Sequence, residues 1–200
     1  MKEKKSVRIR ASPGPIPADE QVRSILDMPT TNDRRPSIRI GYGFDSHEFR
    51  PGLPLKIGGM TLQHEKGLGG HSDGDVLLHA ITDALLGAVA APDIGALFPP
   101  SDPQWKGADS VIFLREALKR VDDAGYSVAN IDASLILAAP KIGPHATEIR
   151  TRVAELLGVH CDCVGLKAKT PEGLNLDAAA IAQVVVLLKK IARPKRKYRR

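Results

Sequence analysis

Residues 71–87, HSDGDVLLHAITDALLG, predict an amphipathic helix that carries two histidines. Apolar side chains recur at helical spacing from Val76 to Ala88, so we expect the helix to begin at about Asp73. Ser72 or Asp73 is a suitable N-cap, and acidic groups in the first turn favour the helix dipole. This helix sets where both histidines lie in the fold.

The separation of His71 and His79 gives them different expected roles. Eight residues at about 1.5 Å each place them roughly 12 Å apart along a helix, too far to share one metal ion. His79, in the middle of the helix, is a candidate metal ligand. His71, beside the unpaired N–H groups of the helix start, is better placed to contact an anion such as phosphate. A lone helical histidine is more often a packing residue, so a metal site needs a second cluster.

That second cluster lies in residues 41–47, GYGFDSH. Residues 37–41 alternate like a strand, and in an extended chain Asp45 and His47 fall on the same face. Together with His79 they form a three-ligand oxygen and nitrogen site. Three protein ligands leave one position open, which is the arrangement of catalytic rather than structural zinc.

A series of further short blocks makes the chain similar to a known family. In order they are residues 39–47, 57–59, 71–79, 93–95, 98–99 and 106–110. Their order and spacing resemble the 2-C-methyl-D-erythritol 2,4-cyclodiphosphate synthase family over about residues 38–191. Each block alone is weak, but the series is specific.

The resemblance implies a lyase of non-mevalonate isoprenoid biosynthesis. Its substrate, 4-diphosphocytidyl-2-C-methyl-D-erythritol 2-phosphate, is converted to 2-C-methyl-D-erythritol 2,4-cyclodiphosphate and CMP. The 2-phosphate of the substrate is itself the nucleophile, which agrees with a sequence that offers no convincing Ser-His or Cys-His dyad. Catalysis is then positioning and charge neutralisation.

The resemblance also implies roles for individual residues. One divalent cation per subunit, with Zn²⁺ the expected ion, is bound by Asp45, His47 and His79, and a Mg²⁺ or Mn²⁺ ion that comes with the substrate diphosphate is bound by Glu172. His71 and Thr170 match the family's transition-state stabilisers. The expected substrate contacts are Ser72, Asp93, Gly95, Phe98, Asp102, Ala138, Ala139, Pro140, Lys141, Lys169 and Glu172.

Two segments depart from the family pattern. Pro100 stands where family members often carry an acid, which affects the loop of Asp102. After Glu172, residues 173–180 read GLNLDAAA, a shorter segment that lacks the family's arginine. The metal residues are untouched, whereas a diphosphate contact and any feedback site near this segment are affected.

The charge of the chain is unevenly distributed. The formal net charge is +6, but residues 189–200 carry eight basic and no acidic residues, and residues 38–188 are net acidic. A weak nucleic-acid contact is therefore expected only through the basic C-terminal tail. No apolar run has membrane-spanning length, the N-terminus lacks a secretory segment, and the two cysteines predict reduced thiols. We expect a cytoplasmic protein without membrane contact.

The alternation of strand and helix patterns predicts an α/β chain of the α+β sandwich type. We expect a mixed four-stranded sheet, a small hairpin near residues 55–62 and helices on one face; by resemblance, the sheets face inward in a homotrimer. Strands are predicted at 37–41, 130–138, 163–169 and 181–190, and helices at 73–90, 110–124 and 144–157. The domain is expected over 38–191, with a disordered basic arm at 1–37 and a basic tail at 192–200.

Two other functions agree with the same residues. A generic zinc-dependent phosphohydrolase would use a metal-bound water. A nucleic-acid-associated domain would use its metal only for stability and bind through the tail, Lys189 to Arg200. Metal-dependent retention of CMP distinguishes a cyclase from both.

Overall fold

The computed structural model describes residues 35–174 and 176–191. The predictions for the N-terminal arm and the basic tail therefore lie almost entirely outside the described residues. Among these residues, no helix has both the length and the apolar character needed to cross a bilayer.

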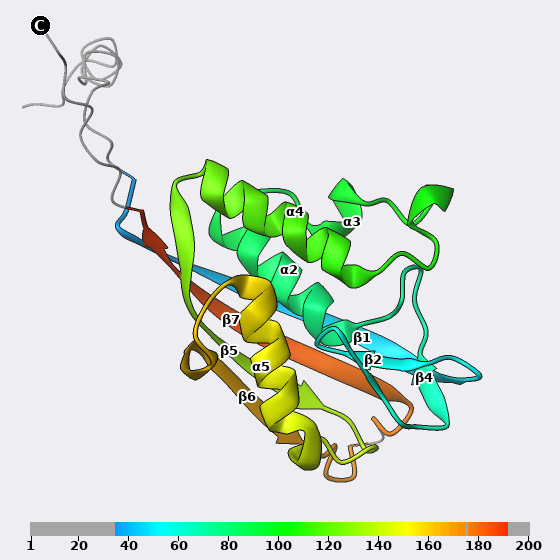
Figure 1. The fold of residues 1–200 in the computed structure, drawn as a ribbon. Helices are drawn as coiled ribbons and strands as arrows, with labels where there is room; N and C mark the ends of the chain where they lie inside the picture. The colour runs from blue at the N-terminus through cyan, green and yellow to red at the C-terminus, as the bar shows by residue number, and fades with distance from the viewer. Residues whose placement is uncertain (1–34, 175, 192–200) are drawn as a thin grey trace, which may run out of the picture. The chain divides into compact units, whose positions relative to one another are not determined.

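A five-stranded mixed sheet forms one layer of the fold, in the order β4-β1-β7-β5-β6 (Figure 1). The strands are β1 (Ile38–Pro51), β4 (Lys66–Leu68), β5 (Tyr126–Ile136), β6 (Val164–Lys169) and β7 (Ala179–Lys190). β5 and β6 are parallel, and the other pairs are antiparallel. The α+β class is as predicted, and the small hairpin is β2 (Leu55–Ile57) with β3 (Met60–Leu62). The sheet is one strand wider than the four expected, because three residues of the glycine-rich lead into the helix pair with the end of β1 as β4.

Helices cover one face of this sheet (Figure 1). The long helices are α2 (Val76–Ala88), α4 (Ser110–Asp123) and α5 (Ala146–Leu157), and α3 (Ile94–Leu97) is a single turn. Three short 3₁₀ turns, η1 (Pro103–Trp105), η2 (Gly143–His145) and η3 (Cys161–Cys163), lie in the connections. α2 lies between the sheet and α4, so nearly all of its side chains are buried. It is consequently a core helix rather than a surface helix with one apolar stripe.

Two glycines let α2 lie directly on the backbone of β1. A Cβ atom added at Gly41 would be 1.8 Å from the Ala84 carbonyl oxygen, and one added at Gly43 would be 1.9 Å from the Ala80 carbonyl oxygen. No side chain fits at either position without moving the helix. The contact holds α2 at its closest approach to the strand that carries Asp45 and His47.

The start of α2 differs from the prediction by three residues. The helix begins at Val76, and Asp75 rather than Ser72 or Asp73 is the N-cap, with the Leu78 N–H donating to its side chain. The Asp75 carboxylate is fully buried and also accepts hydrogen bonds from the Gly58 and Gly59 N–H groups, at 2.9 and 2.6 Å. It therefore joins the β2–β3 hairpin to the helix. The spacing of apolar residues marked the helix correctly but could not rank three adjacent capping residues.

Among the described residues, no helix covers the opposite face of the sheet (Figure 1), and the part of that face formed by β1 and β7 bears exposed apolar side chains. Tyr42 on β1 pairs with Val185 on β7, and the two side chains are 59% and 44% exposed. Other exposed apolar side chains on β1 are Ile38, Ile40 and Phe44. An apolar patch of this kind on one sheet face is typical of a protein–protein interface.

Candidate metal and phosphate site

Three predicted metal ligands meet at the junction of β1 and α2. The Oδ2 atom of Asp45 lies 2.8 Å from His47 Nε2 and 3.0 Å from His79 Nδ1, and the two ring nitrogens are 3.0 Å apart. Asp45 and His47 share the face of β1 that packs against the helix layer, as their i, i+2 spacing predicted. His79 reaches them from the buried side of α2. The three atoms therefore form a nearly equilateral triangle.

This triangle has the donor set and the size of a divalent-cation site. Bonds of about 2.0 Å to a tetrahedral ion place its ligand atoms roughly 3.3 Å apart, slightly wider than the separations here. One carboxylate oxygen and two imidazole nitrogens are ordinary ligands of zinc. The residues present thus fit the cation that the sequence led us to expect.

The electrostatics of the cluster favour a bound cation. Burial alone would raise the pKa of Asp45, but the hydrogen bonds from His47 and His79 and their positive charge lower it well below its ordinary value. Burial opposes the charged form of His47, yet the hydrogen bond and the charge of Asp45 raise the pKa of its ring. The carboxylate is therefore ionised at neutral pH and draws positive charge to the point between the three side chains.

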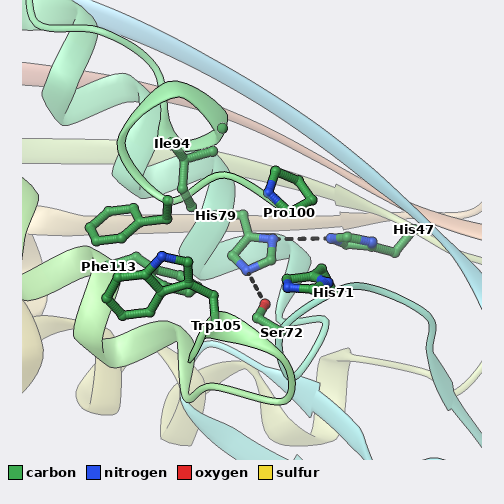
Figure 2. Close-up of a pocket in the computed structure, with 10 residues that line it drawn as sticks. His47, His71, Ser72, His79, Ile94, Pro100, Trp105 and Phe113 are labelled. Atoms are coloured by element: carbon green, nitrogen blue, oxygen red, sulfur yellow. Dashed lines mark hydrogen bonds between the residues drawn. The ribbon is translucent and has the colours of Figure 1, made fainter. Parts of the chain in front are cut away.

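A cavity of about 180 Å³ opens beside the triangle (Figure 2). His47 and His79 form part of its wall together with His71 and Ser72. Its remaining lining residues are Ile94, Gly95, Phe98, Pro100, Trp105 and Phe113. His71 and Ser72 thus line the same cavity as two of the three predicted metal ligands.

His71 is held in this cavity by a loop rather than by a helix. Its carbonyl oxygen accepts from the Gly107 N–H at 2.8 Å, and its Nε2–H donates to the Asp102 carbonyl at 3.2 Å. Because α2 begins only at Val76, the spacing of roughly 12 Å expected along a helix does not apply to His71. The loop folds back so that both histidines face one cavity (Figure 2).

Aromatic side chains form one wall of the cavity. The ring centroid of Phe113 lies 4.6 Å from that of Phe98 and 5.8 Å from that of Trp105. Trp105, Phe113 and Ile94 were not predicted as site residues. The chain has only one tryptophan and four phenylalanines, and the presence of three of these five rings within residues 98–113 was a usable signal.

The acidic and glycine residues of the adjoining loop have structural roles in this structure. The carboxylate of Asp93 accepts from the Ala96 N–H and caps α3, whose Gly95 lines the cavity. The carboxylate of Asp102 caps η1. Asp83, one turn beyond His79 on α2, accepts from the Ile94 N–H at 2.8 Å. Asp83 therefore fixes the position of α3 rather than of the histidine.

The other predicted substrate contacts lie at the ends of β5 and β6. Ala138, Ala139 and Lys141 follow β5 and are exposed, and Pro140 follows Ala139 through a cis peptide bond. Lys169 ends β6, and the Thr170 hydroxyl donates to the carboxylate of Glu172, both in an exposed turn. These residues form a second group, the β5–β6 turn group (residues 138–141 and 169–172).

The β5–β6 turn group does not meet the metal triangle within one chain. Through the sheet, Ser46 pairs with Ile181, Ile181 with Ile136, and Ile136 with Lys169. Three strand spacings of about 4.8 Å separate Lys169 from β1, or roughly 14 Å. Within one chain, the predicted site residues therefore form two separate groups.

A second group of potential metal ligands, His160, Cys161 and Asp162, lies on the surface at η3. Nδ1 of His160 already accepts from the Asp162 N–H, at 3.3 Å. The three side chains come from consecutive residues, and those of His160 and Asp162 are mostly exposed. Nothing else in this turn indicates a ligand.

The chain is similar to proteins of known activity. The profile of the YgbB family matches residues 38–189. The 2-C-methyl-D-erythritol 2,4-cyclodiphosphate synthase of Koribacter versatilis (strain Ellin345) is 69% identical over 153 residues, covering 76% of this chain and 99% of the relative. The chloroplastic synthase of Arabidopsis thaliana is 46% identical over 188 residues, covering 92% and 79%. A solved 2C-methyl-D-erythritol-2,4-cyclodiphosphate synthase in its CDP-bound form superposes with a TM-score of 0.72 at 43% identity, covering 76% of this chain and 100% of that one.

Proposed function

The chain belongs to the YgbB family of 2-C-methyl-D-erythritol 2,4-cyclodiphosphate synthases, and we propose that the cavity beside Asp45, His47 and His79 is where its cyclisation takes place. The reaction converts 4-diphosphocytidyl-2-C-methyl-D-erythritol 2-phosphate to 2-C-methyl-D-erythritol 2,4-cyclodiphosphate and CMP, as a phosphorus–oxygen lyase of isoprenoid biosynthesis. The observation that carries the proposal is the ligand triangle, with separations of 2.8–3.0 Å, at the wall of a cavity that also contains His71 and Ser72.

The reaction needs no nucleophile from the protein. An oxygen of the substrate's 2-phosphate bonds to the β-phosphorus, the bond from that phosphorus to the bridging oxygen breaks, and CMP leaves with that oxygen. The task of the chain is to hold the two phosphates in line and to offset their charge. A cavity lined by imidazole, hydroxyl and aromatic groups suits a task of this kind.

We assign the metal triangle to one divalent cation, with Zn²⁺ the proposed ion. Held by Asp45, His47 and His79, it supplies a Lewis acid for a phosphoryl oxygen. His71, whose Nε2–H already donates to the Asp102 carbonyl, has its other ring nitrogen available toward substrate. Ser72 offers its hydroxyl from the next position in the same loop.

The β5–β6 turn group is assigned to the nucleotide and its diphosphate. Glu172 provides a carboxylate for a Mg²⁺ or Mn²⁺ ion that arrives with the substrate, since these ions prefer carboxylate and phosphate oxygens. Thr170, whose hydroxyl donates to that carboxylate, is assigned to the transferring phosphate. The exposed residues 138–141 and Lys169 are assigned to the cytosine and phosphate contacts, and Asp93 and Gly95 to the ribose.

We propose a homotrimer in which one subunit's triangle meets a neighbour's β5–β6 turn group. Two observations support this assembly: the separation of roughly 14 Å across three strands, and the exposed apolar sheet face that bears Tyr42 and Val185. Burying that face between subunits removes apolar surface from water at about 25 cal/mol per Å². Light scattering should give about three times the chain mass of 21.5 kDa; a monomeric mass would contradict the proposal.

Product analysis tests the function directly. The protein is incubated with the cytidine diphosphate ester and Mg²⁺, and the products are separated. A cyclase releases CMP and the cyclic diphosphate in equal amounts, whereas a phosphohydrolase releases CMP with a linear phosphate. CMP release without the cyclic product would overturn the proposal. A cytoplasmic location and a weak nucleic-acid contact through the tail stay predictions.

A further inference from the structure

A chain of polar side chains, fully buried at Ser110 and partly buried at Asp73 and Lys56, lies behind His79, on the side away from the metal triangle. Ser110 is the first residue of α4 and is fully buried. Its Oγ atom lies 2.8 Å from His79 Nε2, and its hydroxyl also donates to Oδ1 of Asp73. The other oxygen of Asp73, Oδ2, accepts from Lys56 Nζ at 3.0 Å. Lys56 comes from β2, so the chain of contacts links β2, the loop before α2 and the start of α4, and reaches the histidine through Ser110.

The direction of these hydrogen bonds follows from the groups themselves. Burial opposes the charge of Asp73, but the hydrogen bonds from Ser110 and Lys56 offset it, and the pKa of the carboxyl is lowered. An ionised carboxylate only accepts, so the Ser110 hydroxyl proton points to Asp73. The lone pairs of Ser110 then face His79, whose Nε2 must carry the ring proton. Without a cation Nδ1 donates to Asp45; when a cation binds it takes the place of that proton, and the Nδ1 lone pair faces the point between Asp45 and His47.

We infer that Lys56, Asp73 and Ser110 are positioning residues that fix the tautomer and the ring orientation of His79, so that Nδ1 is presented to the metal. The inference rests on the proposed metal site. Asp73 has a further tie to the segment before α4, because its N–H donates to the Ala108 carbonyl at 3.0 Å. The loop that carries His71 and Ser72 and the start of α4 are thus joined at the same point.

Ser72 does not replace Ser110 in this role. Its Oγ atom also lies near His79 Nε2, at 3.0 Å, but Ser72 lines the cavity and is half-buried. A hydroxyl in that position is available to substrate. Ser110 is closed off from the cavity by its burial and has a charged acceptor behind it. The fixed partner of the ring is therefore Ser110.

The test measures metal affinity rather than turnover. Ser110→Ala is compared with wild type by chelator competition for Zn²⁺ and by the absorption spectrum of the Co²⁺-loaded protein. Loss of a hydrogen-bond partner of a metal-bound histidine typically lowers metal affinity 10- to 100-fold, and we expect a loss of about that size with a changed Co²⁺ spectrum. Thr82→Val is the matched control. Thr82 is fully buried on α2, the helix of His79, and its hydroxyl donates to the Leu78 carbonyl. This control should leave both readouts unchanged.

A second variant keeps the test decisive. Asp73→Ala should weaken Zn²⁺ binding in the same range, and the double variant should lose little more, since both act through one chain of contacts. If Ser110→Ala does not fold, Asp73→Ala decides alone. Wild-type affinity and an unchanged Co²⁺ spectrum in the folded variants would overturn the inference. A wild-type protein that binds neither Zn²⁺ nor Co²⁺ would instead overturn the metal site itself.

Discussion

The metal triangle and the β5–β6 turn group lie at the same end of one sheet but are held in opposite ways. Asp45 on β1 pairs with Ala182 on β7, which pairs with Leu135 near the end of β5. At the β1 end of this row the functional side chains hydrogen-bond to one another and are largely buried. At the β5 end they are exposed, and the Thr170 hydroxyl donates a hydrogen bond to the Glu172 carboxylate.

This difference indicates which half of the site is complete on its own. A cation site must hold its ligands within a few tenths of an ångström, and burial with further hydrogen bonds provides that precision. Groups that bind a flexible nucleotide need access more than rigidity. The ligand triangle is therefore held in place within one chain, and in the proposed trimer the turn group would act where a neighbouring subunit faces it.

The largest effect is expected from removing a ligand of the triangle. His79→Ala should lose the bound cation and lower turnover on the order of a thousandfold, because a preorganised charge opposite the phosphates is lost. The ring is one of many buried groups on α2, so the fold should survive. Metal content by elemental analysis and turnover are the measurements. A variant with full zinc occupancy would show that the triangle is not the site.

A substitution at the N-cap of α2, the helix that carries His79, should lower the stability of the fold instead. Asp75→Ala removes the acceptor of three N–H groups, those of Gly58, Gly59 and Leu78. Buried N–H donors left without an acceptor cost about 1–3 kcal/mol each. The substitution also removes a carboxyl group whose pKa is raised by burial, and this offsets part of the cost. We therefore expect the free energy of unfolding to fall by about 3 kcal/mol. Urea unfolding measures it. A loss below about 1 kcal/mol would mean that water replaces the carboxylate.

A change in the turn group should reduce activity and leave metal and stability unaltered. Glu172→Gln is expected to lower turnover about 10- to 100-fold through the diphosphate-bound cation. Elemental analysis should show the same zinc content as wild type, and urea unfolding the same stability. Loss of zinc in this variant would mean that the two groups are coupled within one chain.

Mixing the two inactive proteins makes the comparison sharper. If sites form between subunits, unfolding and reassembling His79→Ala with Glu172→Gln creates some sites with an intact triangle from one chain and an intact turn from its neighbour. Random assembly in equal amounts should restore roughly a quarter of wild-type turnover, whereas sites contained in one chain should show no more than the residual turnover of the two impaired variants.

The smallest effect is a pH dependence at Asp83, which joins α2 to α3 on the side of the metal triangle. Burial raises its pKa above the ordinary value of 3.8, as do the charges of Asp93 and Asp45, while the Ile94 N–H opposes the shift. An acid with a raised folded-state pKa is penalised once ionised, so stability falls as the pH rises from about 4 through the folded pKa. Asp83→Asn keeps the acceptor oxygen and removes the charge. Its stability relative to wild type should therefore rise over this range, by less than about 1 kcal/mol for a half-exposed group.

The residues that met in space were those whose spacing has a geometric meaning. Two positions apart on a strand, Asp45 and His47 had to share a face, and the apolar pattern placed His79 on a helix. The α+β class followed from the same periodicities. The sheet's fifth strand, β4, was missed because its three residues are too few to show an alternating pattern.

Contacts made by loops could not be predicted in the same way. The position of His71 in the cavity depends on a hydrogen bond from the Gly107 N–H, thirty-six positions further along the chain. The role of Ser110 depends in the same way on Asp73, which lies thirty-seven positions before it. No local pattern records such pairs. Asp83 lies one turn after His79, but its carboxylate accepts from the Ile94 N–H, eleven positions along the chain.

The contact of α2 with Gly41 and Gly43 has a consequence for how this protein tolerates mutation. Gly43 lies two residues before Asp45, and the carbonyl it faces belongs to Ala80, next to His79. The distance between α2 and β1 therefore also sets the distances from the His79 nitrogen to the ligand atoms of Asp45 and His47. A methyl group at Gly43 would raise the helix and widen the ligand triangle together. In a saturation library this glycine should be as intolerant as a ligand, although it bears no functional group.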